Sequence, residues 1–270
     1  MDPLTNPFRE LLSNNAVPVG TWLMSGAVST AEAMGCAGFN WVVVDMEHVP
    51  IDYKDAYHLL QAIAGTPATP VVRLAWNDGV LVKRALDIGA QTLMFPFVQN
   101  ADDARRAVAA TRYPLPGAAS PGTRGFAAMH RASRYATVAD YGKRANEGVF
   151  RMIQIETGEA LGRLEEIAAV DGVDSIFMGP GDLSAALGHI GNIAHADVQN
   201  AMADAAKRAR ALGKPIGTVG PTPEMVQSFL NMGYDYVAIA SDMGMMMRQA
   251  NQFLTALRPA LAKQVSSGVY

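Results

Sequence analysis

Four chemically active side chains stand just past short apolar runs, where a buried strand would end. Glu156 follows the run MIQI, and Asp182 lies in GPGDLS after the run SIFM. His48 ends the stretch WVVVDMEH, and Arg73 follows the two valines of PVVR. Carboxylates bind hard cations, imidazole transfers protons near neutral pH, and a guanidinium stabilises developing negative charge. A fold that gathers these strand ends can support metal-assisted acid–base chemistry on a small anion.

Glu156 and Asp182 have no histidine or cysteine partner adjacent to them in the sequence. An oxygen-rich pair of this kind, completed by water or a chelating substrate, suits Mg²⁺ or Mn²⁺ better than structural zinc. The alternative is local, because Glu156 can cap the helix that begins in TGEALGRL and Asp182 can cap the turn into LSAAL. The residues alone leave the two interpretations equally open.

Arg73, His48 and Asp87 each allow a catalytic and a structural interpretation. Arg73 can bind a substrate carboxylate or stabilise an enolate, but it can also form an ion pair with Asp45 or Glu47. His48 is the one histidine predicted at a strand end, although a lone histidine is more often structural. Asp87, in RALDIGAQTLMFP, ends a predicted helix and either accepts hydrogen bonds locally or orients an imidazole.

Eight short apolar runs alternate with segments of helical periodicity. Most helical segments begin at a Ser, Thr, Asp or Asn suited to N-capping, and several end on glycine. Near-continuous apolar runs indicate parallel strands that are covered on both faces. The predicted strands occupy residues 17–23, 41–46, 70–74, 92–98, 152–156, 175–179, 214–220 and 236–240.

This alternation predicts an α/β protein with a (β/α)8 TIM barrel, and a doubly wound open sheet is the alternative. Neither G-x-G-x-x-G nor a P-loop follows the first run, which argues against the nucleotide-binding open sheets. In a barrel the active site lies at the carboxyl ends of the strands. The predicted strand ends therefore bring Trp22 and Gln154 to the same mouth as the residues above.

Residues 113–151 interrupt the rhythm with three prolines, five glycines and several arginines. We expect this segment to be the elongated loop after strand four, with a short helix near residues 137–147. Long loops inside compact domains are usually lids or binding loops. No linker, low-complexity segment or second domain is evident, so residues 1–270 are expected to form a single barrel domain.

Composition and charge exclude several functional classes. Half of the residues are hydrophobic and 17% are charged, which supports a sizeable core. A net charge of -3 provides no basic field of the kind that binds nucleic acid or anionic membranes. Cys36 is the sole cysteine, so neither an intrachain disulfide nor a cysteine zinc site can form. Because no signal-peptide pattern or long apolar run is present, we expect a soluble cytoplasmic protein.

Several motifs occur together and in a fixed order, namely GTW, DMEH, VVR, ALDIGAQTLMFPFV, IQIET and GPGDLS. Together they closely resemble the HpcH/HpaI aldolase family, the pyruvate-specific class II aldolases typified by 4-hydroxy-2-oxoheptanedioate aldolase and 2-keto-3-deoxy-L-rhamnonate aldolase. The resemblance runs from about residue 8 to about residue 258. It implies a metal-dependent enzyme that reversibly cleaves a 4-hydroxy-2-oxo acid into pyruvate and an aldehyde through a metal-bound pyruvate enolate.

The resemblance also implies roles for individual residues. Glu156 and Asp182 match two carboxylates that bind a divalent metal ion, Mg²⁺ or Mn²⁺, with Co²⁺ also possible. His48 matches the catalytic base, Asp87 the carboxylate that raises its basicity, and Arg73 the side chain that stabilises the enolate. The positions expected to bind the 2-oxo acid are Gln154, the backbone at Gly181, Arg73 and Trp22.

Assembly and partners follow from the same resemblance. The eighth helix is expected to exchange between subunits, so that residues 242–262 pack on a neighbouring subunit of a hexamer built as a trimer of dimers. The expected partners are the 2-oxo acid and aldehyde substrates, with no nucleic acid and no membrane. The alternatives are a related metal-enolate lyase, of the oxaloacetate decarboxylase or malyl- or citramalyl-CoA lyase type, and a catalytically silent barrel, since fold does not imply function.

Overall fold

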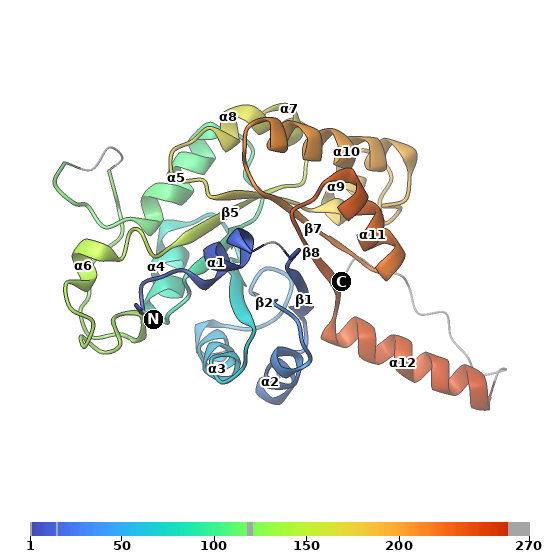
Figure 1. Cartoon of the computed structure of the whole chain (residues 1–270), viewed down its shortest axis with the longest axis horizontal. Helices are drawn as coiled ribbons and strands as arrows, with labels where there is room; N and C mark the ends of the chain where they lie inside the picture. Colours follow the sequence, from blue (N-terminus) through green and yellow to red (C-terminus); the bar gives the residue numbers. More distant parts are fainter. Residues whose placement is uncertain (1, 15, 118–120, 259–270) are drawn as a thin grey trace.

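The chain forms a closed barrel of eight parallel strands in the order β1 to β8 (Figure 1). The computed structural model describes residues 2–14, 16–117 and 121–258. Each strand pairs with its neighbours in the sequence, and β8 closes the barrel against β1, which confirms the predicted (β/α)8 fold. The strands are β1 Val19–Leu23, β2 Trp41–Asp45, β3 Thr69–Arg73, β4 Thr92–Phe95, β5 Phe150–Ile155, β6 Ser175–Met178, β7 Ile216–Gly220 and β8 Tyr236–Ser241.

Helices follow the strands and surround the barrel (Figure 1). Most of the longer helices begin at a residue whose side chain caps the first backbone amides. Asp52 caps α3 in a capping box, and Asp78 caps α4. The α-helices are α1 Pro7–Ser13, α2 Val28–Cys36, α3 Tyr53–Ile63, α4 Gly79–Asp87, α5 Ala101–Thr111, α6 Tyr141–Arg144, α7 Gly158–Gly162, α8 Leu164–Ala168, α9 Pro180–Ala186, α10 Ala196–Ala211, α11 Pro223–Met232 and α12 Asp242–Leu257.

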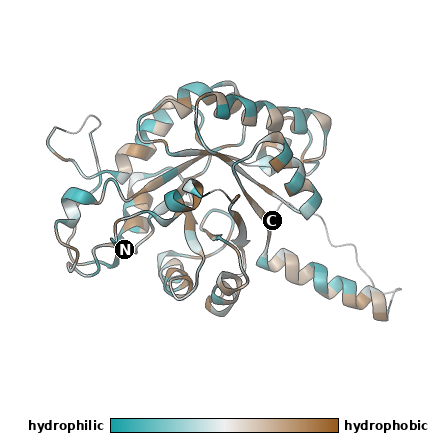
Figure 2. Cartoon of the chain, in the orientation of Figure 1, coloured by the Kyte–Doolittle hydropathy of each residue, from teal (hydrophilic) through white to brown (hydrophobic). Residues whose placement is uncertain are grey.

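The strands are buried on both faces, as their unbroken apolar runs predict. All five residues of β2 and all six of β5 are buried. Figure 2 shows hydrophobic residues along the central strands, whereas hydrophilic residues lie on the outer helices. One face of each strand fills the barrel interior and the other contacts the surrounding helices, so an alternating polar pattern is not possible.

Helix α1 closes the barrel at the amino-terminal ends of the strands. The side chain of Asn6 accepts hydrogen bonds from the Phe8 and Arg9 amides and donates to the Gly148 carbonyl, which fixes the start of α1. Phe8 is fully buried, and its ring lies 5.6 Å from that of Trp41. Because Phe8 and its aromatic neighbours close the amino-terminal end, the carboxyl ends of the strands form the open end of the barrel.

The described parts of the long segment, residues 113–117 and 121–151, lie at the other end of the barrel from the one expected. The segment begins after α5, not directly after β4, and leads through α6 into the start of β5. A connection from a helix to the next strand lies at the amino-terminal ends of the strands, so the expectation of a lid over this chain's own mouth is wrong. The expected short helix is confirmed but briefer, because α6 covers only Tyr141–Arg144.

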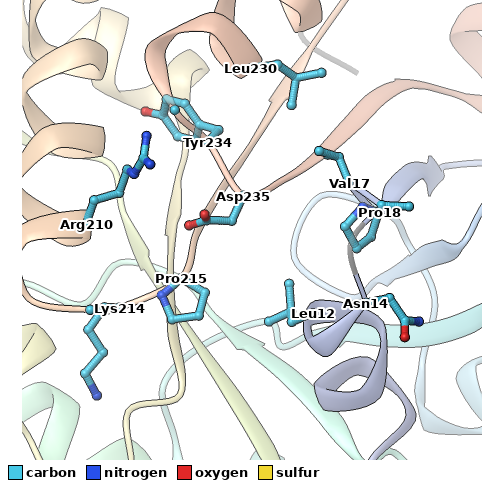
Figure 3. A pocket seen from close by; sticks show the side chains of 13 residues that line it. Leu12, Asn14, Val17, Pro18, Arg210, Lys214, Pro215, Leu230, Tyr234 and Asp235 are labelled. Atoms are coloured by element: carbon cyan, nitrogen blue, oxygen red, sulfur yellow. The ribbon is translucent and has the colours of Figure 1, made fainter.

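A hollow of about 540 Å³ also lies at the amino-terminal end of the barrel (Figure 3). Pro215 and Asp235, which line it, directly precede β7 and β8, and Leu12 of α1 forms another side. The lining contains none of the residues predicted to act in catalysis. Because barrel enzymes place their chemistry at the carboxyl ends of the strands, we do not assign the reaction to this hollow.

Helix α12 projects away from the barrel at the lower right of Figure 1. Asp242 is its one buried residue, and it anchors the helix by accepting hydrogen bonds from the amides of Met24 and Ser25. Residues 259–262 of the predicted exchanged segment lie outside the described residues, and the exchange itself stays a prediction. The exposed apolar side chains of α12 are Met243, Met246, Met247, Phe253, Leu254 and Leu257.

Among the residues that the structure describes, none of the helices combines the length and the hydropathy that a span across a membrane requires.

Candidate active site

The strand ends bring most of the predicted site residues to one mouth. Asp45 and Arg73 are the last residues of β2 and β3, and they are direct partners in the parallel register. Glu156 follows β5, and Asp182 lies in the first turn of α9 after β6. Glu47 also lies close enough for its charge to act on both Glu156 and Asp182. The carboxyl ends of four strands therefore supply one cluster of charges.

Arg73 forms the ion pairs that the sequence left as an alternative to substrate binding. Its Nε lies 2.8 Å from Asp45 Oδ1 and its Nη2 lies 2.6 Å from Asp45 Oδ2, a two-pronged contact. Its Nη1 lies 2.9 Å from Glu47 Oε2. The Arg73 side chain is fully buried, so these carboxylates balance a charge that water does not reach.

Trp22 lies beneath this ion pair and supports it. The Arg73 guanidinium lies 5.5 Å from the centre of the Trp22 ring, within the range of a cation–π contact. Trp22 also packs on Trp41 and Phe177 in the barrel interior and is fully buried. The structure therefore places Trp22 under Arg73, where direct contact with a substrate would require the residues above it to move.

Glu156 is almost completely buried, at 2% exposure, and both of its carboxylate oxygens are held. The Phe97 amide donates to Oε1 at 2.6 Å, and the Gln154 side-chain amide donates to Oε2. Burial, followed by repulsion from Glu47 and Asp182, raises the pKa of Glu156 to about 7. A carboxylate whose ionised form is disfavoured in this way becomes a better partner for a cation.

Gly179 makes room for this arrangement. A Cβ at position 179 would lie 2.8 Å from both Glu156 Oε2 and Gln154 Nε2. Any other residue would displace the Gln154 amide or the Glu156 carboxylate, so the first glycine of GPGD leaves room for the hydrogen bond between these two side chains.

Asp182, Gly181 and His48 form the exposed side of the mouth. Gly181 is half-buried at the start of α9, and its carbonyl accepts a hydrogen bond from Ser184 Oγ at 2.6 Å. The Asp182 side chain is exposed. Half of the His48 side chain is exposed, and its Nε2 lies 3.9 Å from Glu47 Oε2. An imidazole that solvent reaches, beside a carboxylate, can exchange protons with a bound ligand.

Asp87 does not join the mouth in this chain. It ends α4, which runs back towards the amino-terminal ends of the strands, so it lies at the end of the barrel opposite to His48. Its carboxylate contacts Arg124 at 2.8 Å and lies 3.6 Å from His130 Nε2. Asp87 therefore cannot orient the His48 of its own chain, and its expected role towards His48 stays a prediction.

Sequence reasoning missed the part that Phe97 plays in the site. Phe97 has a φ of 53°, a left-handed conformation that is rare for a bulky residue, and this conformation accompanies the hydrogen bond to Glu156. Its ring stacks on that of Trp76, with centroids 5.5 Å apart. The motif FPFV carries no glycine or asparagine, the usual signals of a left-handed residue. The conformation of Phe97 could therefore not be predicted from the sequence.

A second group of metal-binding residue types lies outside the mouth. His189, His195 and Asp197 bring their ligand atoms within 4.8 Å of one another. The two imidazole rings stack with centroids 3.5 Å apart, and His189 Nε2 lies 2.9 Å from Asp197 Oδ2. Stacked rings do not point their nitrogen lone pairs at one shared position, so the geometry favours a hydrogen bond between His189 and Asp197 over a metal site.

Comparison with known proteins places the chain among aldolases. A 2-dehydro-3,6-dideoxy-6-sulfogluconate aldolase of Pseudomonas putida is 56% identical over 96% of this chain and all of its own length. A 5-keto-4-deoxy-D-glucarate aldolase of Escherichia coli is 42% identical over 94% of this chain and 96% of its own.

A solved structure agrees with these relatives. It belongs to an HpcH/HpaI aldolase/citrate lyase family protein from Burkholderia cenocepacia, which shares 39% identity and superposes with a TM-score of 0.90. The superposition covers 94% of this chain and all of the other. Residues 19–249, which include all eight strands and the mouth, match the HpcH/HpaI aldolase/citrate lyase family. The chain belongs to this family, and it is an aldolase, a carbon–carbon lyase.

Proposed function

We propose that this aldolase depends on a divalent metal ion and cleaves a 4-hydroxy-2-oxo acid into pyruvate and an aldehyde. The observation that carries the proposal is the charge balance of the mouth. Four carboxylates, those of Asp45, Glu47, Glu156 and Asp182, surround the single guanidinium of Arg73. When all four are ionised the cluster has three negative charges in excess, which a divalent cation would largely offset.

The residues present fit such an ion. Glu156 and Asp182 remain available because Asp45 and Glu47 hold Arg73, and a purely oxygen donor set suits Mg²⁺ or Mn²⁺, with Co²⁺ also possible. Gln154 Oε1 is buried without a hydrogen-bond partner, so the site also has an acceptor for a metal-bound water or substrate hydroxyl. When bound, the ion would polarise the 2-oxo group of the substrate as a Lewis acid.

The protein side chains would carry the remaining steps. His48, directly or through a water, removes the proton of the 4-hydroxyl group as the C3–C4 bond breaks, and the aldehyde leaves. The electron pair of that bond stays on the pyruvate fragment as an enolate, whose charge Arg73 stabilises. Protonation at C3 then gives pyruvate. Gln154 and the backbone at Gly181 would orient the 2-oxo acid, with Trp22 supporting Arg73 from below.

The relatives narrow the class of substrate. The names of the two aldolases similar to this chain specify a sulfogluconate and a glucarate derivative. Both are sugar acids that carry a second acidic group, so we propose an acidic sugar derivative as the substrate and a cytoplasmic catabolic role.

The active enzyme would contain more than one copy of the chain. The exposed apolar face of α12 lacks cover within the described part of one chain, which supports exchange of this helix and the expected hexamer, a trimer of dimers. A second copy would also be the only source from which an Asp87 carboxylate could reach His48, because within one chain the two residues lie at opposite ends of the barrel.

Pyruvate release tests the proposed reaction. The purified protein should release pyruvate from a panel of 4-hydroxy-2-oxo acids, lose this activity in EDTA, and regain it when Mg²⁺, Mn²⁺ or Co²⁺ is returned, because the carboxylate cluster needs a cation to act on the keto group. Pyruvate can be followed by a coupled dehydrogenase assay. Full activity in EDTA would contradict the metal requirement.

Replacement of the proposed base gives a second prediction. His48→Ala should lower the cleavage rate by about 10² or more, in line with typical contributions of general bases, while the affinity for the metal changes little. His58→Ala, which removes an exposed histidine on α3, is the matched control and should leave the rate unchanged. A cleavage rate close to normal in His48→Ala would remove His48 from this role.

The assembly proposal predicts a change in mass. Phe253→Asp together with Leu257→Asp should reduce the particle to smaller species in analytical ultracentrifugation, because charges replace apolar contacts between copies. The control is Gln252→Asp, which places a charge on the same helix at a position that is already polar. An unchanged hexamer in the double variant, or a monomer in the unaltered protein, would contradict the proposal.

A further inference from the structure

Two aromatic side chains at the mouth contact each other without belonging to the proposed chemistry, and the backbone amide of one of them donates to Glu156. Trp76 follows β3 and Phe97 follows β4, so the two rings come from neighbouring strands of the barrel. Their ring planes differ by 28°, which is a stacked arrangement. About half of each side chain is exposed, at 52% for Trp76 and 45% for Phe97. Burial in the core therefore does not explain why the two rings are in contact.

The backbone of Phe97 is strained in a way that serves Glu156. A φ of 53° places Phe97 in the left-handed region, which is sterically crowded for a residue with a Cβ, and such conformations persist only where the surrounding structure enforces them. In this conformation the Phe97 amide lies 2.6 Å from Glu156 Oε1. If Phe97 relaxed to an ordinary φ, the amide would turn away and the buried carboxylate would lose one of its two donors.

The neighbouring segments fix the two ring-bearing loops. Asn77 Nδ2 donates to the Asp103 carbonyl at 3.0 Å, which ties the Trp76 loop to α5. The Gln99 amide donates to Asp103 Oδ2 at 2.9 Å, and Gln99 also accepts a hydrogen bond from Thr157 beside Glu156. Asp103 therefore holds both loops, and the Trp76 ring has a firm base from which to contact Phe97.

We propose that the stack of Trp76 on Phe97 is a positioning device for Glu156: it holds Phe97 in the left-handed conformation that aims its amide at Glu156 Oε1. The inference rests on the proposed function, in which Glu156 binds the metal ion. Phe97 and Gln154 then fix both carboxylate oxygens, and each oxygen would keep a lone pair available for a cation. Partners of this kind around a metal ligand contribute about tenfold to a hundredfold to metal affinity.

Glycine separates loss of the ring from release of backbone strain. Phe97→Ala and Phe97→Gly both remove the stack, but alanine keeps the Cβ that disfavours a positive φ, whereas glycine adopts it without steric cost. Phe97→Ala should therefore weaken the metal site and Phe97→Gly should largely preserve it. Trp76→Ala should resemble Phe97→Ala, and Trp76→Phe, which can still stack, should restore the affinity.

The experiment is a titration of metal-free protein with Mn²⁺, followed by calorimetry or by the electron paramagnetic resonance signal of free Mn²⁺. We expect Kd to rise about tenfold in Trp76→Ala and Phe97→Ala, and to stay within about twofold of the unaltered protein in Phe97→Gly. The double variant Trp76→Ala with Phe97→Gly should match Phe97→Gly alone, because nothing remains for Trp76 to hold. Circular dichroism would verify that each variant is folded.

Two outcomes would overturn the inference on its own. One is a change of less than about twofold in Trp76→Ala, and the other is an equal loss when Trp76→Ala is added to the unaltered protein and to the Phe97→Gly variant. A Glu156→Gln arm separates these from failure of the proposed function. If Glu156→Gln binds Mn²⁺ as tightly as the unaltered protein, Glu156 is not a metal ligand and both proposals fall. If Glu156→Gln loses Mn²⁺ while Trp76→Ala does not, the positioning proposal alone falls.

Discussion

The buried ion pair between Arg73 and Asp45 is the interaction on which the mouth of the barrel depends. The two residues are register partners at the ends of β3 and β2, and the guanidinium is fully shielded from solvent. Removal of one partner from a buried pair typically costs about 3–5 kcal/mol, because an uncompensated charge remains. The pair therefore fixes the ends of two strands and dedicates Asp45 to Arg73.

Once Asp45 is occupied in this way, the other carboxylates determine what the site can bind. Glu47 shares Arg73, and burial raises the pKa of Glu47 against the pull of that guanidinium. Glu156 has no cationic partner in direct contact among the described residues, and Phe97 and Gln154 merely hold its oxygens in place. A site of this kind is poised for a cation supplied from outside, which is the role that the proposed metal ion would fill.

The sequence predicted the parts of the site that follow from strand ends. Parallel strands place their carboxyl ends together, so Arg73, Glu156 and Asp182 could be assigned to one mouth before any contact was known. Strand ends could not place Asp87 at the mouth, because it ends a helix, and a helix that follows a strand returns to the opposite end of the barrel. The expectation that the long segment covers the mouth was wrong for the same reason, because the segment follows the helix α5 and not the strand β4.

Other features depend on three-dimensional contacts that leave no local signal. The left-handed conformation of Phe97 arises from its contacts with Glu156 and Trp76. Glu156 follows β5 and Trp76 follows β3, so neither is a neighbour of Phe97 in the sequence. The full burial of Trp22 beneath Arg73 depends on Trp41 and Phe177 in the barrel interior. The conformation of Phe97 and the burial of Trp22 are determined by packing between separate elements. A sequence motif indicates only that a residue of the right type is present.

The raised pKa of Glu156 is the property on which the proposed metal site depends. It is tested most directly by the affinity of the metal-free protein for Mn²⁺ as a function of pH. Because a proton and the ion compete for a group with a pKa of about 7, affinity should rise about tenfold between pH 6 and pH 8 and then level off. Glu156→Gln should bind Mn²⁺ weakly at both pH values, without this rise. An affinity that is already constant from pH 6 to pH 8 in the unaltered protein would mean that no proton competes with Mn²⁺ for Glu156.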